Sequence, residues 1–139
     1  MEFTRRGALA VGAGVAATLM LPVRGAMAAA DDMIAEFTGG ASVGDSGITL
    51  TTPEIAENGN TVPIEVDAPG AVSILVLASG NPTPDVATFN FGPLAGAQRA
   101  STRIRLAGTQ DVVAVAKMAD GSFVQARNTV KVTIGGCGG

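Results

Sequence analysis

Histidine, tryptophan and tyrosine are absent from this chain of 139 residues, and cysteine occurs once, at Cys137. Without histidine, the chain lacks the commonest general base and the commonest metal ligand of proteins. One cysteine without histidine also excludes a Ser-His or Cys-His catalytic pair and a Cys/His zinc site made by this chain alone. The acidic residues show no recognisable catalytic spacing. We therefore predict that the chain is not an enzyme and holds no metal or resident cofactor.

Aromatic residues are scarce, at 4% of the chain, whereas apolar residues make up 47%. The core must therefore be built from Val, Ile, Leu, Ala and a few Phe. Segments rich in Val and Thr between Gly and Pro favour β-structure over a helical bundle. The length is that of one small domain with short additions.

The first 28 residues have the pattern of an export signal. Arg5 and Arg6 open a charged region, residues 7–21 are uncharged and largely apolar, and Ala26-Met27-Ala28 supplies a small-x-small cleavage site. The paired arginines resemble a twin-arginine signal, which exports folded proteins. A membrane anchor is the alternative, but the apolar run is short and weakly hydrophobic for a membrane span. We predict a twin-arginine-type signal peptide over residues 1–28 and a periplasmic mature protein without a membrane anchor.

The mature chain is acidic. Removal of residues 1–28 takes away three arginines and one glutamate, which leaves 6 basic and 11 acidic residues and a net charge of −5. Nucleic-acid phosphates require a basic surface, so a nucleic-acid partner is not expected.

Residues 29–47 predict an N-terminal segment with a short helix. Met33, Ile34 and Phe37 have the spacing of one helix face, and Gly39-Gly40 ends the helix. Apolar residues then recur at every second position, which indicates strands over residues 48–134.

Several strands can be placed individually. Residues 61–67 alternate as a half-exposed strand, in which Pro63 indicates an edge position. Residues 74–77 are apolar without interruption, which suits a strand covered on both faces, and a partner chain could supply one cover. Residues 100–106 place Ser101, Arg103 and Arg105 on one face, where a solvated sheet face is favoured over a docking patch.

The C-terminal half completes the count. Asp120-Gly121 predicts a hairpin between a strand over 111–118 and one over 122–127, and residues 129–134 alternate as a last strand. About seven short strands without a long helix between them predict an all-β fold, an immunoglobulin-like β-sandwich over residues 48–134.

The chain ends in Gly135-Gly136-Cys137-Gly138-Gly139. Glycine loses the most entropy on ordering, so residues 135–139 predict a flexible swinging arm, whose reach is roughly 17 Å when extended. The thin arm could enter a narrow channel and deliver its sulfur there. A disordered tail with an incidental thiol is the alternative, although exported proteins usually avoid an unpaired exposed cysteine.

Nothing beside Cys137 in the sequence activates its sulfur. An unperturbed thiol is mostly protonated at neutral pH, and no cationic residue neighbours Cys137. We therefore interpret Cys137 as a covalent attachment point whose reactions are catalysed by partner enzymes.

The ending VTIGGCGG at residues 132–139 resembles the SoxY family, the thiosulfate carrier subunits of the bacterial Sox sulfur-oxidising system. Segments 37–40, 56–63, 80–84 and 101–107 resemble the same family. The resemblance implies an immunoglobulin-like sandwich that forms a heterodimer with a second sandwich subunit, SoxZ.

The resemblance also implies the chemistry on Cys137. A haem-containing enzyme would couple thiosulfate to the sulfur as a cysteine-S-thiosulfonate, a hydrolase would release sulfate, and a sulfur-oxidising dehydrogenase would act on the remaining sulfur. The chain would thus carry thiosulfate-derived sulfur intermediates between these enzymes.

Two other functions fit the residues. The chain could be an exported structural β-sandwich module that is cross-linked through Cys137. It could also be a thiol relay for disulfide exchange, although such relays usually use a second, resolving cysteine.

Overall fold

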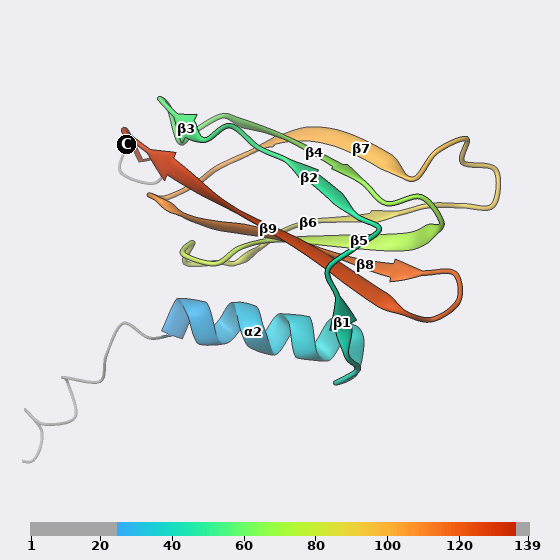
Figure 1. The fold of residues 1–139 in the computed structure, drawn as a ribbon. Coiled ribbons are helices and arrows are strands. Elements are labelled where there is room, and N and C mark those ends of the chain that lie inside the picture. Colours follow the sequence, from blue (N-terminus) through green and yellow to red (C-terminus); the bar gives the residue numbers. More distant parts are fainter. Residues whose placement is uncertain (1–24, 136–139) are drawn as a thin grey trace, which may run out of the picture.

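The computed structural model describes residues 25–135, which form one helix packed on a β-sandwich of two sheets (Figure 1). The all-β, immunoglobulin-like sandwich with an N-terminal helix that the sequence predicts is thereby confirmed. Nine strands lie within the described residues. In chain order the elements are α2 (Gly25–Thr38), β1 (Val43–Gly44), β2 (Thr49–Thr51), β3 (Ile55–Ala56), β4 (Val62–Asp67), β5 (Ala71–Ala78), β6 (Asp85–Asn90), β7 (Arg99–Ile104), β8 (Gln110–Met118) and β9 (Phe123–Val132).

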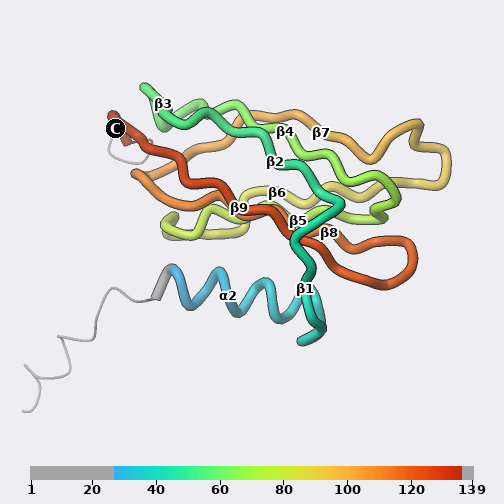
Figure 2. The backbone as a smooth tube through the Cα atoms, viewed as in Figure 1, coloured from blue at the N-terminus to red at the C-terminus, as the bar shows by residue number. Residues whose placement is uncertain are grey.

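The larger sheet has the order β1-β9-β8-β5-β6, with β3 also paired to β9, and the smaller sheet has the order β2-β4-β7. Strands β1 and β3 pair with β9 in parallel, while β2 pairs with β4 of the smaller sheet. The backbone trace shows how the segment from β1 to β3 passes from the larger sheet to the smaller one and back (Figure 2). It closes one side of the sandwich.

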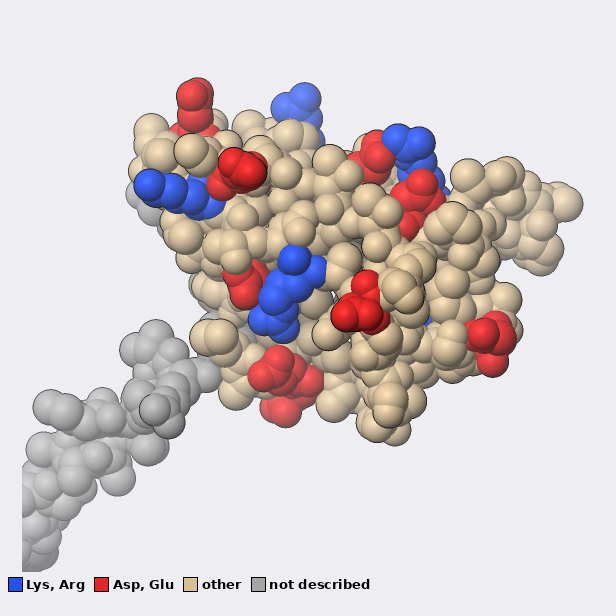
Figure 3. All heavy atoms as spheres, viewed as in Figure 1, with Lys and Arg blue, Asp and Glu red and all other residues tan. Residues whose placement is uncertain are grey.

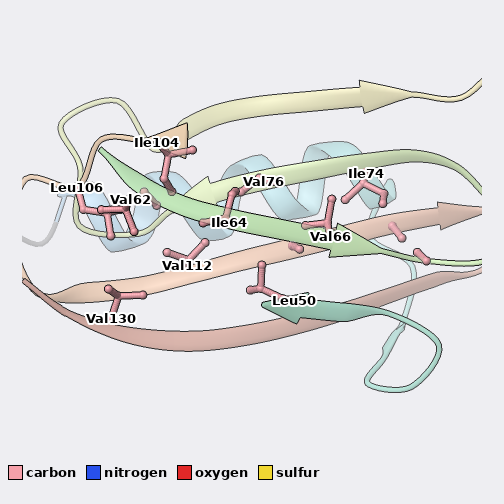
Figure 4. Packing of buried hydrophobic residues seen from close by; sticks show 14 of the residues in the cluster. Leu50, Val62, Ile64, Val66, Ile74, Val76, Ile104, Leu106, Val112 and Val130 are labelled. Atoms are coloured by element: carbon pink, nitrogen blue, oxygen red, sulfur yellow. The ribbon is translucent and has the colours of Figure 1, made fainter. Parts of the chain in front are cut away.

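The main core lies between the two sheets and consists of aliphatic side chains (Figure 4). Alternation along β4 buries Val62, Ile64 and Val66, as the sequence predicts. The predicted edge position of β4 is wrong, because this strand lies between β2 and β7. Strand β2 pairs with β4 only as far as Glu65, so Pro63 lies beyond that ladder and interrupts no hydrogen bond with β2.

Helix α2 covers the outer face of the larger sheet. Its side chains Met33, Ile34 and Phe37 pack on a second apolar cluster formed by β5 and β8, namely Leu75, Leu77, Val113 and Val115. The run at residues 74–77 is therefore buried on both faces by this chain itself, and the expectation of a partner as one cover is wrong. The helix ends where Gly39 and Gly40 adopt positive φ, as predicted.

Strand β9 joins two stretches that the sequence suggests as separate strands. Val124, Ala126, Val130 and Val132 have the same parity and all pack on the main core, so one uninterrupted strand serves both stretches. The predicted hairpin before it is confirmed. The Asp120 carboxylate accepts hydrogen bonds from the N–H and Oγ of Ser122, and Gly121 adopts φ 88°.

Two parts of the predicted domain division can be compared with the structure. Helix α2 starts at Gly25, before the predicted cleavage site, and β1 lies inside the segment 29–47. Most of the predicted signal peptide lies outside the described residues, so its boundary stays a prediction. Within residues 25–135, no helix combines the length and apolar character that a membrane span requires.

Candidate functional site

Cys137 and its neighbours Gly136, Gly138 and Gly139 lie outside the described residues, and Gly135 is the last residue described. The structure therefore describes the segment from which the predicted arm begins. We call residues 131–135 the arm root. It comprises the end of β9 and the three residues that follow it, and it lies beside β3 (Figure 1).

On one side, the arm root is hydrogen-bonded to β3 and to the residues just before and after β3. Three of these bonds join backbone groups, and the fourth is made by a threonine side chain. They run from Lys131 N to Glu54 O (2.9 Å), from Thr133 N to Ala56 O (3.1 Å), from Gly59 N to Ile134 O (2.7 Å) and from Thr133 Oγ1 to Glu57 O (3.1 Å).

On the other side, the arm root meets the loop between β7 and β8. The Thr109 hydroxyl accepts a hydrogen bond from Val132 N–H at 3.0 Å. A Cβ atom placed on Gly135 would lie less than 3.0 Å from the Ala107 carbonyl oxygen, closer than real Cβ atoms approach. Glycine at this position is therefore required by packing. Its predicted contribution to flexibility is a separate property and stays a prediction.

A buried polar network holds that loop. Asn81 and Gln110 are only 6% and 8% exposed, and their amide groups bond to each other and to the loop backbone. Asn81 Oδ1 accepts from Ala107 N–H at 2.9 Å, and Asn81 Nδ2 donates to Arg105 O at 2.8 Å. Sequence reasoning missed this network, because it joins residues about thirty positions apart and its amides resemble those of any polar loop.

Two open grooves lie near this end of the molecule. The larger, about 570 Å³, runs over β4 and β7, and the smaller, about 350 Å³, lies beside the arm root. The smaller groove is lined by Pro53, Ile55, Ala56, Glu57, Asn58, Thr61 and Pro63. Ile55 and Ile134 are 56% and 66% exposed, so apolar surface lies next to the arm root. The larger groove lies farther along the sheet, so the smaller one is the nearer of the two to the arm root.

The charged side chains form no field of one sign around this region. On the face shown in Figure 3, basic and acidic side chains are interspersed. Arg103 and Arg105 are exposed, as predicted for a solvated sheet face. Within residues 25–135, no group of three or more carboxylate, thiol or imidazole side chains could hold a metal ion. Every buried side-chain nitrogen or oxygen described has a hydrogen-bond partner.

Comparison with protein families matches residues 34–137 to the model of SoxY, a sulfur oxidation protein. The match covers more than half of the chain and extends through Cys137. Comparison with curated proteins returns no match.

Among solved structures, the chain is similar to the sulfur carrier protein SoxY from Chlorobium limicola f thiosulfatophilum. The identity is 38% and the TM-score 0.65, over 75% of this chain and 96% of that one. It is also similar to superoxide reductase (neelaredoxin) from Ignicoccus hospitalis, with 15% identity and a TM-score of 0.55, over 63% of this chain and 80% of that one. A likeness at 15% identity shows the shared fold alone.

Proposed function

The chain belongs to the SoxY family of sulfur oxidation proteins, and from this premise we propose that it carries thiosulfate-derived sulfur intermediates covalently on Cys137. The observation that carries the proposal is the extent of the family match, which includes Cys137, the only thiol of the chain. The similar protein from Chlorobium limicola f thiosulfatophilum is itself named a sulfur carrier.

The sandwich and the C-terminal segment would have different roles in the carrier. The sandwich supplies the base, and the arm root is hydrogen-bonded to it up to Ile134 and packs on it at Gly135. Cys137 is the second of the four residues beyond Gly135, so its Cα would lie roughly 7 Å from that of Gly135 when the chain is extended. Since three of them are glycines, the sulfur is presented on a segment that is almost free of side chains. Such a segment suits entry into the narrow active sites of partner enzymes, with the body of the carrier left outside.

The chemistry on Cys137 would be supplied by partners. A haem-containing enzyme would join the thiolate sulfur to the terminal sulfur of thiosulfate, and two electrons would pass to the haem centres. A hydrolase would then add water to the thiosulfonate and release sulfate, which leaves a persulfide on Cys137. A sulfur-oxidising dehydrogenase would oxidise that persulfide sulfur. The carrier would work in the periplasm, after twin-arginine export, as a heterodimer with SoxZ.

The test is the intact mass of the mature protein after incubation with thiosulfate and the oxidising coupling enzyme. We expect a gain of one thiosulfonate group that a reductant reverses, and we expect the Cys137→Ser variant to show no gain. Because Cys137 lies beyond the strands of the sandwich, the variant should retain the thermal unfolding midpoint of the unchanged protein.

Other outcomes would favour the alternatives. Formation of permanent disulfide-linked dimers alone would indicate a structural module that is cross-linked through Cys137. Mixed disulfides with many dithiol proteins, without any thiosulfonate, would indicate a thiol relay. A thiosulfonate that persists in the Cys137→Ser variant would contradict attachment at this residue.

A further inference from the structure

We propose that Thr109, Asn81 and Gln110 are positioning residues that hold the arm root in place on the sandwich. The functional meaning of this inference rests on the proposed carrier role, whereas the contacts themselves do not. None of the three side chains is proposed to react with the carried sulfur. They act through the segment to which Cys137 is attached.

Strand β9 extends beyond the point where its neighbour β8 begins. The ladder between β8 and β9 ends at the pair Gln110 and Val130, because β8 begins at Gln110. Beyond this pair, no strand backbone faces Val132 from the β8 side. The Thr109 side chain takes over there and accepts the Val132 N–H at 3.0 Å. A side chain thereby extends the ladder by one bond, opposite the bonds that β3 makes to the same segment.

The buried amides of Asn81 and Gln110 hold the loop that contains Ala107 and Thr109. Asn81 Oδ1 accepts from both Ala107 N–H and Gln110 Nε2, at 2.9 and 2.8 Å. Gln110 Oε1 in turn accepts from Gly80 N–H at 2.9 Å. These amides are buried, and a buried amide that loses its partner is strongly disfavoured, so the network has one favoured arrangement. The loop is thus held in place before it meets the arm root.

Gly135 packs directly on the backbone of Ala107. The Ala107 carbonyl oxygen occupies the space that any side chain at position 135 would need. Backbone thus packs closely on backbone at Gly135, which fixes the position of the arm root against the loop. A tether with a fixed origin samples a smaller volume than one whose origin frays. The effective concentration of its tip inside a docked partner is correspondingly higher.

The experiment uses the mature protein with a nitroxide spin label on Cys137, and it compares Thr109→Val with Thr129→Val. Thr109→Val keeps the shape of the side chain but removes the acceptor for Val132 N–H. Thr129→Val removes the 2.6 Å hydrogen bond from Thr129 of β9 to Asp111 of β8, before the arm root begins. We expect label mobility and Val132 amide exchange to increase in the first variant alone, with exchange faster by about fivefold, the equivalent of one net hydrogen bond. Each variant loses one hydrogen bond, so the unfolding midpoints of both should fall by a similar small amount.

A second pair of variants tests the packing contact. Gly135→Ala must displace the arm root from Ala107, whereas a Cβ on Gly108, in the same loop, meets nothing within 4 Å. Alanine at position 108 keeps the carbonyl that accepts from Gln110. We expect faster amide exchange at Val132 and Thr133 in Gly135→Ala and no change in Gly108→Ala.

Equal label mobility and equal amide exchange in all four variants and the unchanged protein would overturn the proposal. The label does not depend on sulfur chemistry, so this failure is distinct from failure of the carrier role. If Thr109→Val increases the mobility of the label while unlabelled Cys137 never takes up a thiosulfonate, the positioning role is supported and the proposed function is contradicted.

Discussion

Glu65 carries the best-defined charge interaction on the outer face of the smaller sheet. Arg99 Nη2 donates to its carboxylate at 2.6 Å and Ser101 Oγ at 3.0 Å, both from the neighbouring strand β7. The hydrogen bond from Arg99 is the largest cause that lowers the pKa of Glu65, and Ser101 adds to it. A depressed pKa in the folded state means that ionised Glu65 favours folding above its unfolded pKa. This contribution is lost as the pH falls through the folded pKa.

The corresponding prediction concerns Arg99→Gln. We expect the pKa of Glu65 to move upward toward its ordinary value, because the main donor to the ionised carboxylate is removed. The measurement is a carboxyl titration by NMR. Asp120 is the internal control, since its pKa is lowered by Ser122 and should not respond. An unchanged Glu65 midpoint would show that the pair with Arg99 does not form in solution.

Helix α2 decides how the larger sheet is covered. Phe37 lies on its buried face and meets Phe123 of β9 edge to face, with ring centroids 5.9 Å apart and an interplanar angle of 71°. Together with Met33 and Ile34 it shields Leu77 and the other apolar residues of the second cluster. The apolar run at 74–77 is therefore covered within this chain and gives no reason to expect aggregation of the isolated protein.

We predict that Phe37→Ala lowers the free energy of unfolding by about 2 kcal/mol. The loss is smaller than for a fully buried phenylalanine, because the Phe37 side chain is half-buried. Binding of a hydrophobic dye should increase as the sheet face becomes exposed. Glu36→Ala, on the exposed side of the same helix, is the control and should change neither quantity. Equal urea midpoints for the two variants would mean that the helix does not pack on the sheet in solution.

The molecule as a whole has one closed side and one open side. Strands β1, β2 and β3 join the two sheets along β9, and the amide of Asn128 bonds there to Leu50 O at 2.8 Å. On the opposite side, β6 and β7 are the outermost strands of their sheets within the described residues. The arm root lies at one end of this body, beside β3 (Figure 2). The described part of the chain therefore ends at one end of the sandwich, two residues before Cys137 in the sequence.

A truncation tests which N-terminal residues the body needs. The first buried side chain described in α2 is Ala30, at 3% exposure. A protein of residues 29–139 should therefore unfold at the same urea concentration as one that retains residues 25–28. Removal of residues 1–38 deletes the whole helix and should lower that midpoint strongly, because the β5 and β8 face loses its cover. A loss of stability in the 29–139 protein would show that residues 25–28 contribute to the packing of α2.

Much of the fold follows from local patterns. The alternation in β4, the hairpin at Asp120 and the helix stop at Gly39 are written in residues that are neighbours in the chain. Periodicity and backbone preference act locally, so they can be predicted without knowledge of the tertiary contacts. The parity of Val130 and Val132 likewise points to one core-facing side of β9. The position of Pro63 could not be predicted in this way, because strand order is a property of the assembled sheet.

The amino-acid sequence alone shows a single thiol flanked by glycines, with no cationic residue beside it in the chain. The contacts of the segment before this thiol are visible only in the folded molecule. Gly135 packs on Ala107, and Thr109 completes the end of β9. The apolar run of β5 is covered by the chain's own helix. A one-dimensional pattern records which side chains must be buried, but the residues that cover them are chosen by folding, which brings distant segments into contact.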